Sequence, residues 1–405
     1  MPSTPPAGEP APADGTLPTK ALEVAGQRGF SIYLHVPYCR TRCGYCDFNT
    51  YTADELGPGV SRETYADQAI AEVRFARQVL GDLDLPVQTV FVGGGTPTLL
   101  PASDLGRMLE AVDAEFGLVP GAEVTTEANP DSVDAASLSQ LRDQGFTRMS
   151  FGMQSTAPHV LALLERTHTP GRAIAAVAEA RAAGFEHVSL DLIYGTPGES
   201  AADFAGSLEA AVSSGVDHVS AYSLIVEDGT RLAGRIRRGE LPMPDDDVAA
   251  DRYLQADAAL SAAGLQWYEV SNWAQPGAEC RHNLAYWRSA DWWGIGPGAH
   301  SHVGGVRWWN VRHPTAYAAR LSAGESPAQA RELLSQADQQ VEDIMLRIRL
   351  SDGLPLESAS NQGRIGAAKA LGDGLLEPTA YSDGVAVLTL RGRLLADAVV
   401  RELVD

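Results

Sequence analysis

The chain is poor in cysteine, in basic residues and in long apolar runs. Its 405 residues include only four cysteines, which excludes a disulfide scaffold and suits the reducing cytoplasm, where we expect this protein. No apolar stretch is long enough for a membrane-spanning helix. Lys and Arg number 31 against 52 Asp and Glu, and the resulting net charge of −21 argues against nucleic acid as a partner.

The first 28 residues lack aromatic side chains. They contain six prolines and show neither an apolar targeting core nor an Arg-rich amphipathic pattern. Such a segment buries too little surface to offset its ordering entropy, so residues 1–28 are predicted to be a disordered tail. The whole chain has a globular balance, with 44% hydrophobic and 20% charged residues, and is long enough for two or three domains.

Three of the four cysteines stand together. Cys39, Cys43 and Cys46 have the spacing C-x3-C-x2-C and directly follow an apolar run typical of a β-strand. Three thiolates on one tight loop can hold three irons of a [4Fe–4S] cluster and leave the fourth iron open to another ligand. A structural zinc site with His35 or Asp47 as the fourth ligand is the alternative.

A seven-residue pattern occurs three times in the middle of the chain. Its copies begin at Gly145, Gly184 and Gly215, and these spacings fit one helix plus one strand each. Each glycine suits the residue after a helix C-terminus, and the apolar residues that follow suit a buried strand. Asp134 and Thr169 suit the starts of the helices that end at the first two glycines.

Further strands are expected at residues 31–36, 87–92 and 123–127, so that about six β/α units lie between residues 29 and 225. Right-handed crossovers curl such units into a partial or full barrel. The predicted fold class is therefore α/β, a partial (β/α)6 barrel over residues 29–235. Functional groups in these barrels gather at the carboxyl ends of the strands, where the cysteine loop also lies.

Other polar groups follow predicted strands too. The sequence Gly-Gly-Gly-Thr-Pro-Thr at residues 93–98 lets the backbone approach a ligand closely. Glu127 and Gln154 end the third and fourth strands, Arg166 suits a carboxylate, and Asp191 after the fifth strand suits a ribose diol. Each alone also fits a plain turn or a buried polar residue satisfied within the barrel. Together they indicate a binding site beside the open iron.

Four short sequences carry a family resemblance. They are Tyr-Leu-His-Val-Pro-Tyr-Cys at 33–39, the glycine-rich sequence at 93–98, Phe-Gly-Met-Gln-Ser at 151–155 and Asp-Leu-Ile-Tyr-Gly at 191–195. They resemble the oxygen-independent coproporphyrinogen III oxidase family of radical SAM proteins, from about residue 30 to near the C-terminus. The resemblance implies that the three cysteines bind a [4Fe–4S] cluster whose open iron binds S-adenosylmethionine (SAM). It also implies SAM contacts at Tyr33, Tyr45, Gly94, Gly95, Thr96, Glu127, Gln154, Arg166, Asp191 and Ile225.

Two branches of this family differ just after the third cysteine. The decarboxylating branch has the pattern C-x3-C-x2-C-x-C, and Phe48 stands here in place of the fourth cysteine. This departure resembles the other branch, whose members are heme chaperones. It argues against oxidation of coproporphyrinogen.

A second site is expected between Trp267 and Trp309, where all seven tryptophans lie together with several histidines. Flat apolar surface and imidazoles suit a porphyrin and its iron. The H-N-x-x-Y-W sequence that begins at His282 resembles the proposed heme-binding motif of the chaperone branch, which nominates His282 as a heme ligand. Cys280 is a second candidate, as thiolate ligand or as covalent attachment point. Alternatively, the tryptophans form core and His282 is only hydrogen-bonded locally.

Residues 236–320 are expected to complete the barrel mouth, and residues 321–405 to form a separate module. Helices are predicted from residue 339 to about 351, around 363–371 and at about 392–403, with a β-hairpin at Asp383-Gly384, an arrangement that resembles a winged helix. Residues 341–405 carry seven Lys or Arg and ten Asp or Glu, so a DNA role is not expected. We expect this module to cover the barrel mouth or to bind a partner protein.

Two functions follow from these features. The first is a carrier that binds heme beside a SAM-coordinated cluster and delivers heme to respiratory hemoproteins, with peripheral contact to membrane proteins, as a monomer or homodimer. The second is an enzyme in which one-electron reduction of SAM gives a 5′-deoxyadenosyl radical that abstracts hydrogen from a porphyrinogen propionate and leads to oxidative decarboxylation. The SAM-contact positions serve both functions, whereas Phe48 and the Trp/His segment favour the carrier.

Overall fold

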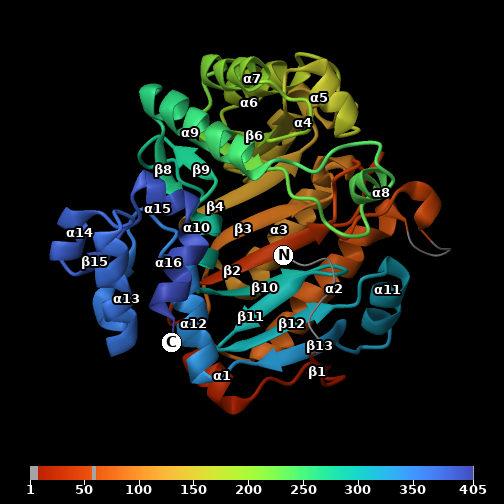
Figure 1. Ribbon diagram of the computed structural model, residues 1–405. Coiled ribbons are helices and arrows are strands. Elements are labelled where there is room, and N and C mark those ends of the chain that lie inside the picture. The colour runs from red at the N-terminus through yellow and green to blue at the C-terminus, as the bar shows by residue number, and fades with distance from the viewer. Residues whose placement is uncertain (1–7, 57–60, 405) are drawn as a thin grey trace.

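The computed structural model describes residues 8–56 and 61–404, and a 13-stranded sheet forms its centre (Figure 1). Six parallel strands occupy the middle of this sheet in chain order, namely β2 (Phe30–Val36), β3 (Val87–Gly94), β4 (Leu118–Ala128), β5 (Arg148–Gln154), β6 (His187–Tyr194) and β7 (His218–Ser223). The connecting helices include α2 (Arg62–Leu80), α3 (Ala102–Phe116), α4 (Ala135–Asp143), α5 (Pro158–Leu163), α6 (Arg172–Ala182) and α7 (Ala201–Ser213). The predicted fold class, a partial (β/α)6 barrel, is confirmed.

Residues of the parallel strands alternate between an apolar and a polar face. In β2, Ile32, Leu34 and Val36 are fully buried in the main core, and full burial of such a side chain contributes roughly 1.5–3 kcal/mol. Tyr33 and His35, which lie between them, point to the other face and hydrogen-bond to each other. The apolar set is therefore held against the helices, and the inner face of the barrel receives the polar side chains.

The repeated glycines end helices as predicted. Gly145, Gly184 and Gly215 have φ angles of 100°, 87° and 78°, a region that favours glycine after a helix C-terminus. Asp134 caps the start of α4, where its side chain accepts a hydrogen bond from the amide of Ser137 at 2.8 Å. Thr169 does not start the next helix, because α6 begins at Arg172, directly after Gly171. The glycines and Asp134 thus mark the boundaries that the repeat indicated.

Later segments extend both edges of the six parallel strands. On the β7 edge lie β9 (Asn272–Ala274) and β8 (Gln266–Glu269), and on the β2 edge lie β10 (Asp291–Ile295), β11 (His300–Val303), β12 (Val306–Asn310) and β13 (Ala328–Leu333). The helices of this part are α8 (Arg231–Arg237), α9 (Asp246–Ala262), α10 (Arg281–Trp287) and α11 (Pro314–Ser322). Because β13 belongs to the large sheet, the module boundary predicted at residue 321 is too early.

The N-terminal segment is ordered from residue 8 on, so the predicted disordered tail is wrong there. In this segment β1 (Glu9–Pro10) pairs with β13, and α1 (Thr19–Val24) follows. Leu17 and Ala21 are buried in the main core. The prediction failed because the partners lie far away in sequence, as with Glu9 and Arg331, whose side chains form an ion pair at 2.8 Å. Residues 1–7 lie outside the described part of the chain.

A second, smaller core lies in the C-terminal module of α12 (Gln336–Arg347), α13 (Asn361–Gly372), α14 (Pro378–Ser382), α15 (Leu390–Leu394) and α16 (Ala396–Leu403). The hairpin predicted at Asp383-Gly384 is wrong, because β15 (Val385–Ala386) pairs with β14 (Leu354–Pro355). Thr389 accepts a hydrogen bond from the amide of Gly392 and so starts α15.

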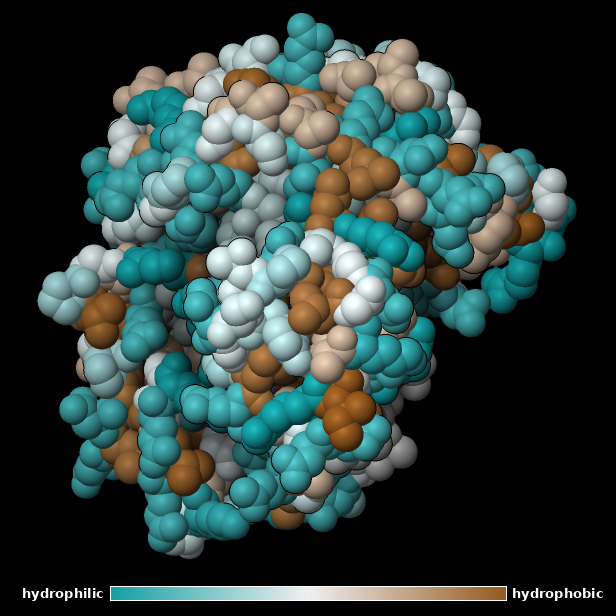
Figure 2. All heavy atoms as spheres, turned by 60° about the vertical axis from the view of Figure 1, so that its left-hand side comes forward, coloured by the Kyte–Doolittle hydropathy of each residue, from teal (hydrophilic) through white to brown (hydrophobic). Residues whose placement is uncertain are grey.

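Hydrophilic side chains cover most of the face that carries the C-terminal module, and they separate small hydrophobic patches (Figure 2). None of the helices within the described ranges is long and apolar enough to cross a membrane.

Candidate functional site

The three clustered cysteines lie on the loop between β2 and α2. This loop is attached to the segment after α5, because the amide of Gly44 donates to the carbonyl of Leu164 at 3.1 Å. Burial raises the pKa of Cys46 to about 12, and the proximity of Cys39 and Cys43 raises it as well. The three thiols therefore lie near one another, and iron binding would displace their protons.

The zinc alternative for these cysteines needs His35 or Asp47 as a fourth ligand. Both ring nitrogens of His35 are already hydrogen-bonded, Nδ1 to the hydroxyl of Tyr33 at 3.0 Å and Nε2 to the carbonyl of Asn49 at 2.9 Å. Within the described residues, no three His, Cys, Asp or Glu side chains lie close enough to hold a single metal ion. The arrangement of His35 thus gives the zinc alternative no support.

The glycine-rich segment after β3 lies directly against the start of the cysteine loop. A Cβ atom on Gly95 would stand 2.4 Å from the carbonyl oxygen of Tyr38, and one on Gly94 would stand 2.6 Å from the ring of His35. The amide of Thr96 donates to the same carbonyl of Tyr38 at 2.7 Å. Only glycine permits this approach, so the sequence brings the backbone of residues 94–96 beside the cysteines.

Two half-buried carboxylates occupy the inner face near this segment. Glu127 on β4 accepts a hydrogen bond from the amide of Gly94 at 3.0 Å, and Asp191 on β6 accepts one from the hydroxyl of Ser150 at 3.0 Å. Burial raises the pKa of Glu127 to about 8, helped by the charge of Asp191, and burial raises the pKa of Asp191 to about 6. Neither forms an ion pair with a described residue, so the site favours a cationic ligand.

Gln154 and Arg166 lie together over Gly152. Arg166 Nη2 donates to the carbonyl of Gly152 at 2.8 Å, and a Cβ on Gly152 would stand 2.7 Å from Arg166 Nη2 and 2.9 Å from Gln154 Nε2. Arg166 Nη1 lies 3.6 Å from Cys43 Sγ, which places this pair beside the cysteine loop.

Both side chains contain one buried polar atom that forms no hydrogen bond with a described residue. Gln154 Oε1 and Arg166 Nε have no hydrogen-bond partner in the described part of the chain. An unsatisfied buried group is destabilising by roughly 1–3 kcal/mol, so such atoms indicate a missing polar ligand. The backbone of Gln154 also has a φ of 69°, a strained value for this residue type that is often found at ligand sites.

These groups fit a [4Fe–4S] cluster with bound SAM. The thiols suit three irons, the carboxylates suit the sulfonium and ammonium groups, and Arg166 suits the carboxylate. Tyr45 belongs to the same group, because Cys43, Arg166 and Asp191 all act on its pKa, which burial raises first. Ile225 lies just after β7 and is 67% exposed.

His282 lies apart from this group, on α10. It is fully buried, with Nδ1 2.7 Å from Thr89 Oγ1 and Nε2 2.9 Å from the hydroxyl of Tyr286. Burial lowers the pKa of His282 to about 4, so the imidazole is neutral, which is the form that binds a metal. Iron ligation requires that one of these two hydrogen-bond partners be displaced.

Two aromatic side chains connect His282 with the carboxylate region. Its ring lies 5.2 Å from that of Phe91, and the ring of Phe91 lies 6.3 Å from that of Tyr33. Burial raises the pKa of Tyr33, and the nearby Glu127 and Tyr286 raise it as well. Phe91 and Tyr33 therefore link His282 with the residues expected to contact SAM.

The other candidates for the second site are mostly inaccessible. Trp267, Trp287 and Trp292 are half-buried, whereas the other four tryptophans belong to the core, so the tryptophans do not form the expected flat open surface. Cys280 is buried with its Sγ 3.6 Å from Glu123 Oε1, and burial followed by the charge of Glu123 raises its thiol pKa.

Sequence reasoning missed a buried ion pair that positions α10. Arg148 and Glu123 lie 3.1 Å apart, and Glu123 also accepts a hydrogen bond from the amide of His282 at 3.0 Å. A signal was present, because the fourth residue of each repeat is basic, namely Arg148, His187 and His218.

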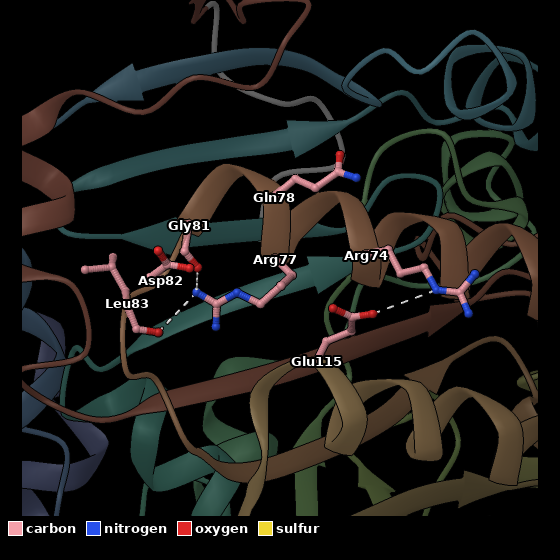
Figure 3. Close-up of a pocket in the computed structure, with 7 residues that line it drawn as sticks. All are labelled: Arg74, Arg77, Gln78, Gly81, Asp82, Leu83 and Glu115. Atoms are coloured by element: carbon pink, nitrogen blue, oxygen red, sulfur yellow. Dashed lines mark hydrogen bonds and ion pairs between the residues drawn. The ribbon is translucent and has the colours of Figure 1, made fainter.

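A surface hollow of about 570 Å³ lies between α2 and α3, away from all of these residues (Figure 3). Arg77 spans it to reach the carbonyls of Gly81 and Leu83, and Arg74 lies 3.8 Å from Glu115. The two arginines are thus occupied in joining α2 to its surroundings.

Comparison with known proteins gives consistent matches. Residues 33–211 match the family model of the radical SAM superfamily. The chain is 56% identical over 375 residues to the heme chaperone HemW of Mycobacterium tuberculosis, covering 92% of this chain and 94% of that protein. It is 35% identical over 343 residues to HemW of Escherichia coli, covering 80% and 84%. The solved structure of coproporphyrinogen III oxidase (HemN) from Escherichia coli has a TM-score of 0.81 over 97% of this chain and 94% of that chain; at 21% identity it shows likeness of fold alone.

Proposed function

This chain belongs to the HemW family of radical SAM proteins, and on that premise we propose that it is a heme chaperone, which binds heme and delivers it to hemoproteins. The observation that carries the proposal is the 56% identity to a heme chaperone over 92% of the chain. Phe48 supports it, because this side chain is 59% exposed beside the cysteine loop, where the decarboxylating branch has a fourth cysteine. The carrier is thus favoured over the enzyme.

In this proposal Cys39, Cys43 and Cys46 hold three irons of a [4Fe–4S] cluster. The backbone of Gly94, Gly95 and Thr96 and the side chains of Tyr33, Tyr45, Glu127, Gln154, Arg166, Asp191 and Ile225 contact SAM. The unsatisfied atoms of Gln154 and Arg166 support this assignment, as do the carboxylates of Glu127 and Asp191, which form no ion pair with any residue that the structure describes. When bound, the cluster and SAM supply one-electron chemistry.

We assign His282 as the heme ligand. Its neutral imidazole suits iron, and the rings of Phe91 and Tyr33 connect it with the expected SAM site. In the arrangement described, Thr89 and Tyr286 hold both ring nitrogens, so Tyr286 acts as the group that heme iron displaces.

The acceptors in this proposal are respiratory hemoproteins, which the protein reaches from the cytoplasm through peripheral contact with membrane proteins, as a monomer or homodimer. The small number of cysteines supports a reducing compartment.

An anaerobic hemin titration of cluster-loaded protein tests the function. We expect saturable binding near one heme per chain, little displacement by coproporphyrin III, and affinity reduced about tenfold or more by His282→Ala. Tyr286→Phe is the matched variant: it removes the competing hydroxyl, keeps the ring, and should leave affinity equal or higher.

Either of two results would contradict this account. If coproporphyrin III binds and hemin does not saturate, the chain acts on porphyrinogens and the enzyme becomes the leading function. If hemin binds equally to His282→Ala, the chaperone survives but its ligand is another residue.

A further inference from the structure

We propose that His168 is a further SAM-positioning residue, whose imidazole meets the amino-acid end of SAM beside Arg166. The inference rests on the proposed SAM site and names a residue that neither the family resemblance nor the sequence motifs indicated. It starts from a third unsatisfied buried atom, on a residue two positions along the chain from Arg166. The Nδ1 of His168 is buried and has no hydrogen-bond partner within residues 8–56 and 61–404, and the side chain is only 7% exposed.

The position of His168 follows from its segment. The residue lies two positions after Arg166, and the next residue, Thr169, is bonded to the turn that follows β4, since its amide donates to Asp131 Oδ2 at 2.9 Å. Glu165, just before Arg166, has a φ of 54°, so this connection between α5 and α6 is strained as well as anchored. The segment is thus held beside the carboxyl ends of β4 and β5, where Gln154 lies.

The charge of Arg166 acts directly on His168. Burial lowers the pKa of His168 to about 4, the nearby Arg166 lowers it further, and Asp131 only partly opposes them. The imidazole is therefore neutral at physiological pH, and its Nδ1 offers one neutral hydrogen-bonding position next to a guanidinium.

The three unsatisfied atoms match one kind of ligand. Gln154 Oε1 can accept a hydrogen bond, Arg166 Nε can donate one, and neutral His168 Nδ1 can do either, according to its tautomer. An α-amino acid end carries both an ammonium and a carboxylate. Arg166 also lies 3.6 Å from Cys43 Sγ, so the ligand end that meets this trio is the end nearest the cluster. A water molecule satisfying His168 alone is the competing explanation.

The test compares two ligands on anaerobic, cluster-loaded protein: SAM, and 5′-methylthioadenosine, which keeps the nucleoside and sulfur but lacks the amino-acid end. We expect His168→Ala to weaken SAM binding about tenfold, as for loss of one hydrogen bond to a charged group, and to change methylthioadenosine binding less than about twofold. His168→Asn keeps a polar nitrogen near the Nδ1 position and should restore most of the affinity. His159→Ala, at an exposed histidine on α5, is the matched control and should change neither.

A purely structural histidine would behave differently. It would weaken both ligands together or neither, and His168→Asn would then follow His168→Ala, which would overturn the inference. If His168→Ala does not fold, His168→Phe replaces it, because this variant keeps an aromatic ring but lacks Nδ1, and the inference requires its affinity for SAM, and not that for methylthioadenosine, to fall. If the wild type itself binds no SAM, the proposed cofactor site fails, and this assignment fails with it.

Discussion

Several side chains of the site lack the ion-pair or hydrogen-bond partners that their buried polar groups need. Glu127 receives one backbone hydrogen bond and no ion pair from a described residue, and Asp191 lies near enough to raise its pKa further after burial. Gln154, Arg166 and His168 each keep one buried polar atom without a partner among the residues described. Such groups reduce the stability of the ligand-free protein, and a ligand with complementary charges removes that penalty.

Glu127 provides a pH-dependent test at this scale. Its pKa in the SAM-free folded protein, about 8, lies above the ordinary value of 4.5, so the folded state holds a proton that the unfolded state loses. The free energy of unfolding should therefore fall as pH rises from about 4.5 to about 8. Glu127→Gln removes this titration. Between pH 5 and pH 8, the free energy of unfolding of this variant should therefore rise by on the order of 2 kcal/mol relative to that of the wild type.

Urea unfolding of SAM-free protein across this pH range measures the effect. Glu325→Gln, at an exposed glutamate, is the control and should keep the slope of the wild type. Parallel pH profiles for Glu127→Gln and the wild type would show that the carboxyl is not perturbed.

At the scale of elements, the site depends on how closely two loops meet at the ends of β2 and β3. The amide of Gly95 donates to the carbonyl of Val36 at 2.8 Å, and the amide of Thr96 donates to that of Tyr38 at 2.7 Å. These backbone contacts align the glycine-rich segment with the start of the cysteine loop. A side chain at Gly95 would displace this backbone and with it the start of the cysteine loop.

Gly95→Ala should therefore impair cluster assembly. Its Cβ would lie 2.4 Å from a backbone oxygen that has no freedom to move aside, so the cysteine loop must shift. We expect reconstituted protein to hold less than half of the about four irons per chain of the wild type, measured as iron and acid-labile sulfide.

Gly206→Ala on α7 is the matched control, because the nearest atom to its Cβ would be Thr156 Oγ1 at 3.7 Å, an ordinary contact. Alanine also favours a helix. Full cluster content in Gly95→Ala would mean that the loops tolerate displacement and that the close approach has no role in assembly.

At the scale of the whole molecule, the N-terminal segment contacts both the large sheet and the C-terminal module. The N-terminal segment adds β1 to the edge strand β13 and buries Leu17 beneath it, while Arg28 forms an ion pair with Asp343 of α12 at 2.9 Å. Figure 1 shows α1 and β1 beside β13, at the side of the sheet away from α4 to α7. Residues 8–28 therefore belong to the folded unit that carries the site.

Leu17→Ala tests this integration. Truncation of a buried leucine to alanine lowers the free energy of unfolding of a protein by about 2–4 kcal/mol. The same change in a disordered tail has no effect. Val24→Ala in the same segment is the control, since Val24 is 40% exposed and should change stability by less than about 0.5 kcal/mol. Equal denaturation midpoints for the wild type, Leu17→Ala and Val24→Ala would mean that the segment is a disordered tail.

Several features could be predicted from sequence because neighbouring residues encode them. The spacing of Cys39, Cys43 and Cys46 places three thiols on one loop whatever the rest of the chain does. The glycines at 145, 184 and 215 end helices through their own backbone freedom. Hydrophobic periodicity then gives the six β/α units, and the rule that functional groups lie at the carboxyl ends of parallel strands places Glu127 and Asp191 near the cysteines.

Other features depend on contacts that no local pattern records. The order of the N-terminal segment comes from β13, and the hairpin expected at Asp383-Gly384 was replaced by pairing with β14. His282 has both ring nitrogens hydrogen-bonded because one meets Thr89, 193 residues away, and the other meets Tyr286 within its own helix.

Local spacing alone thus specified the cysteine loop, the β/α units and the candidate residues at the strand ends, because covalent geometry and backbone preference act over a few residues. Only the tertiary structure decided which polar atoms remain unsatisfied, which carboxyls keep a raised pKa, and whether His282 is free to bind iron. The reason is physical: burial, desolvation and hydrogen-bond partnership arise when segments far apart in the chain come together.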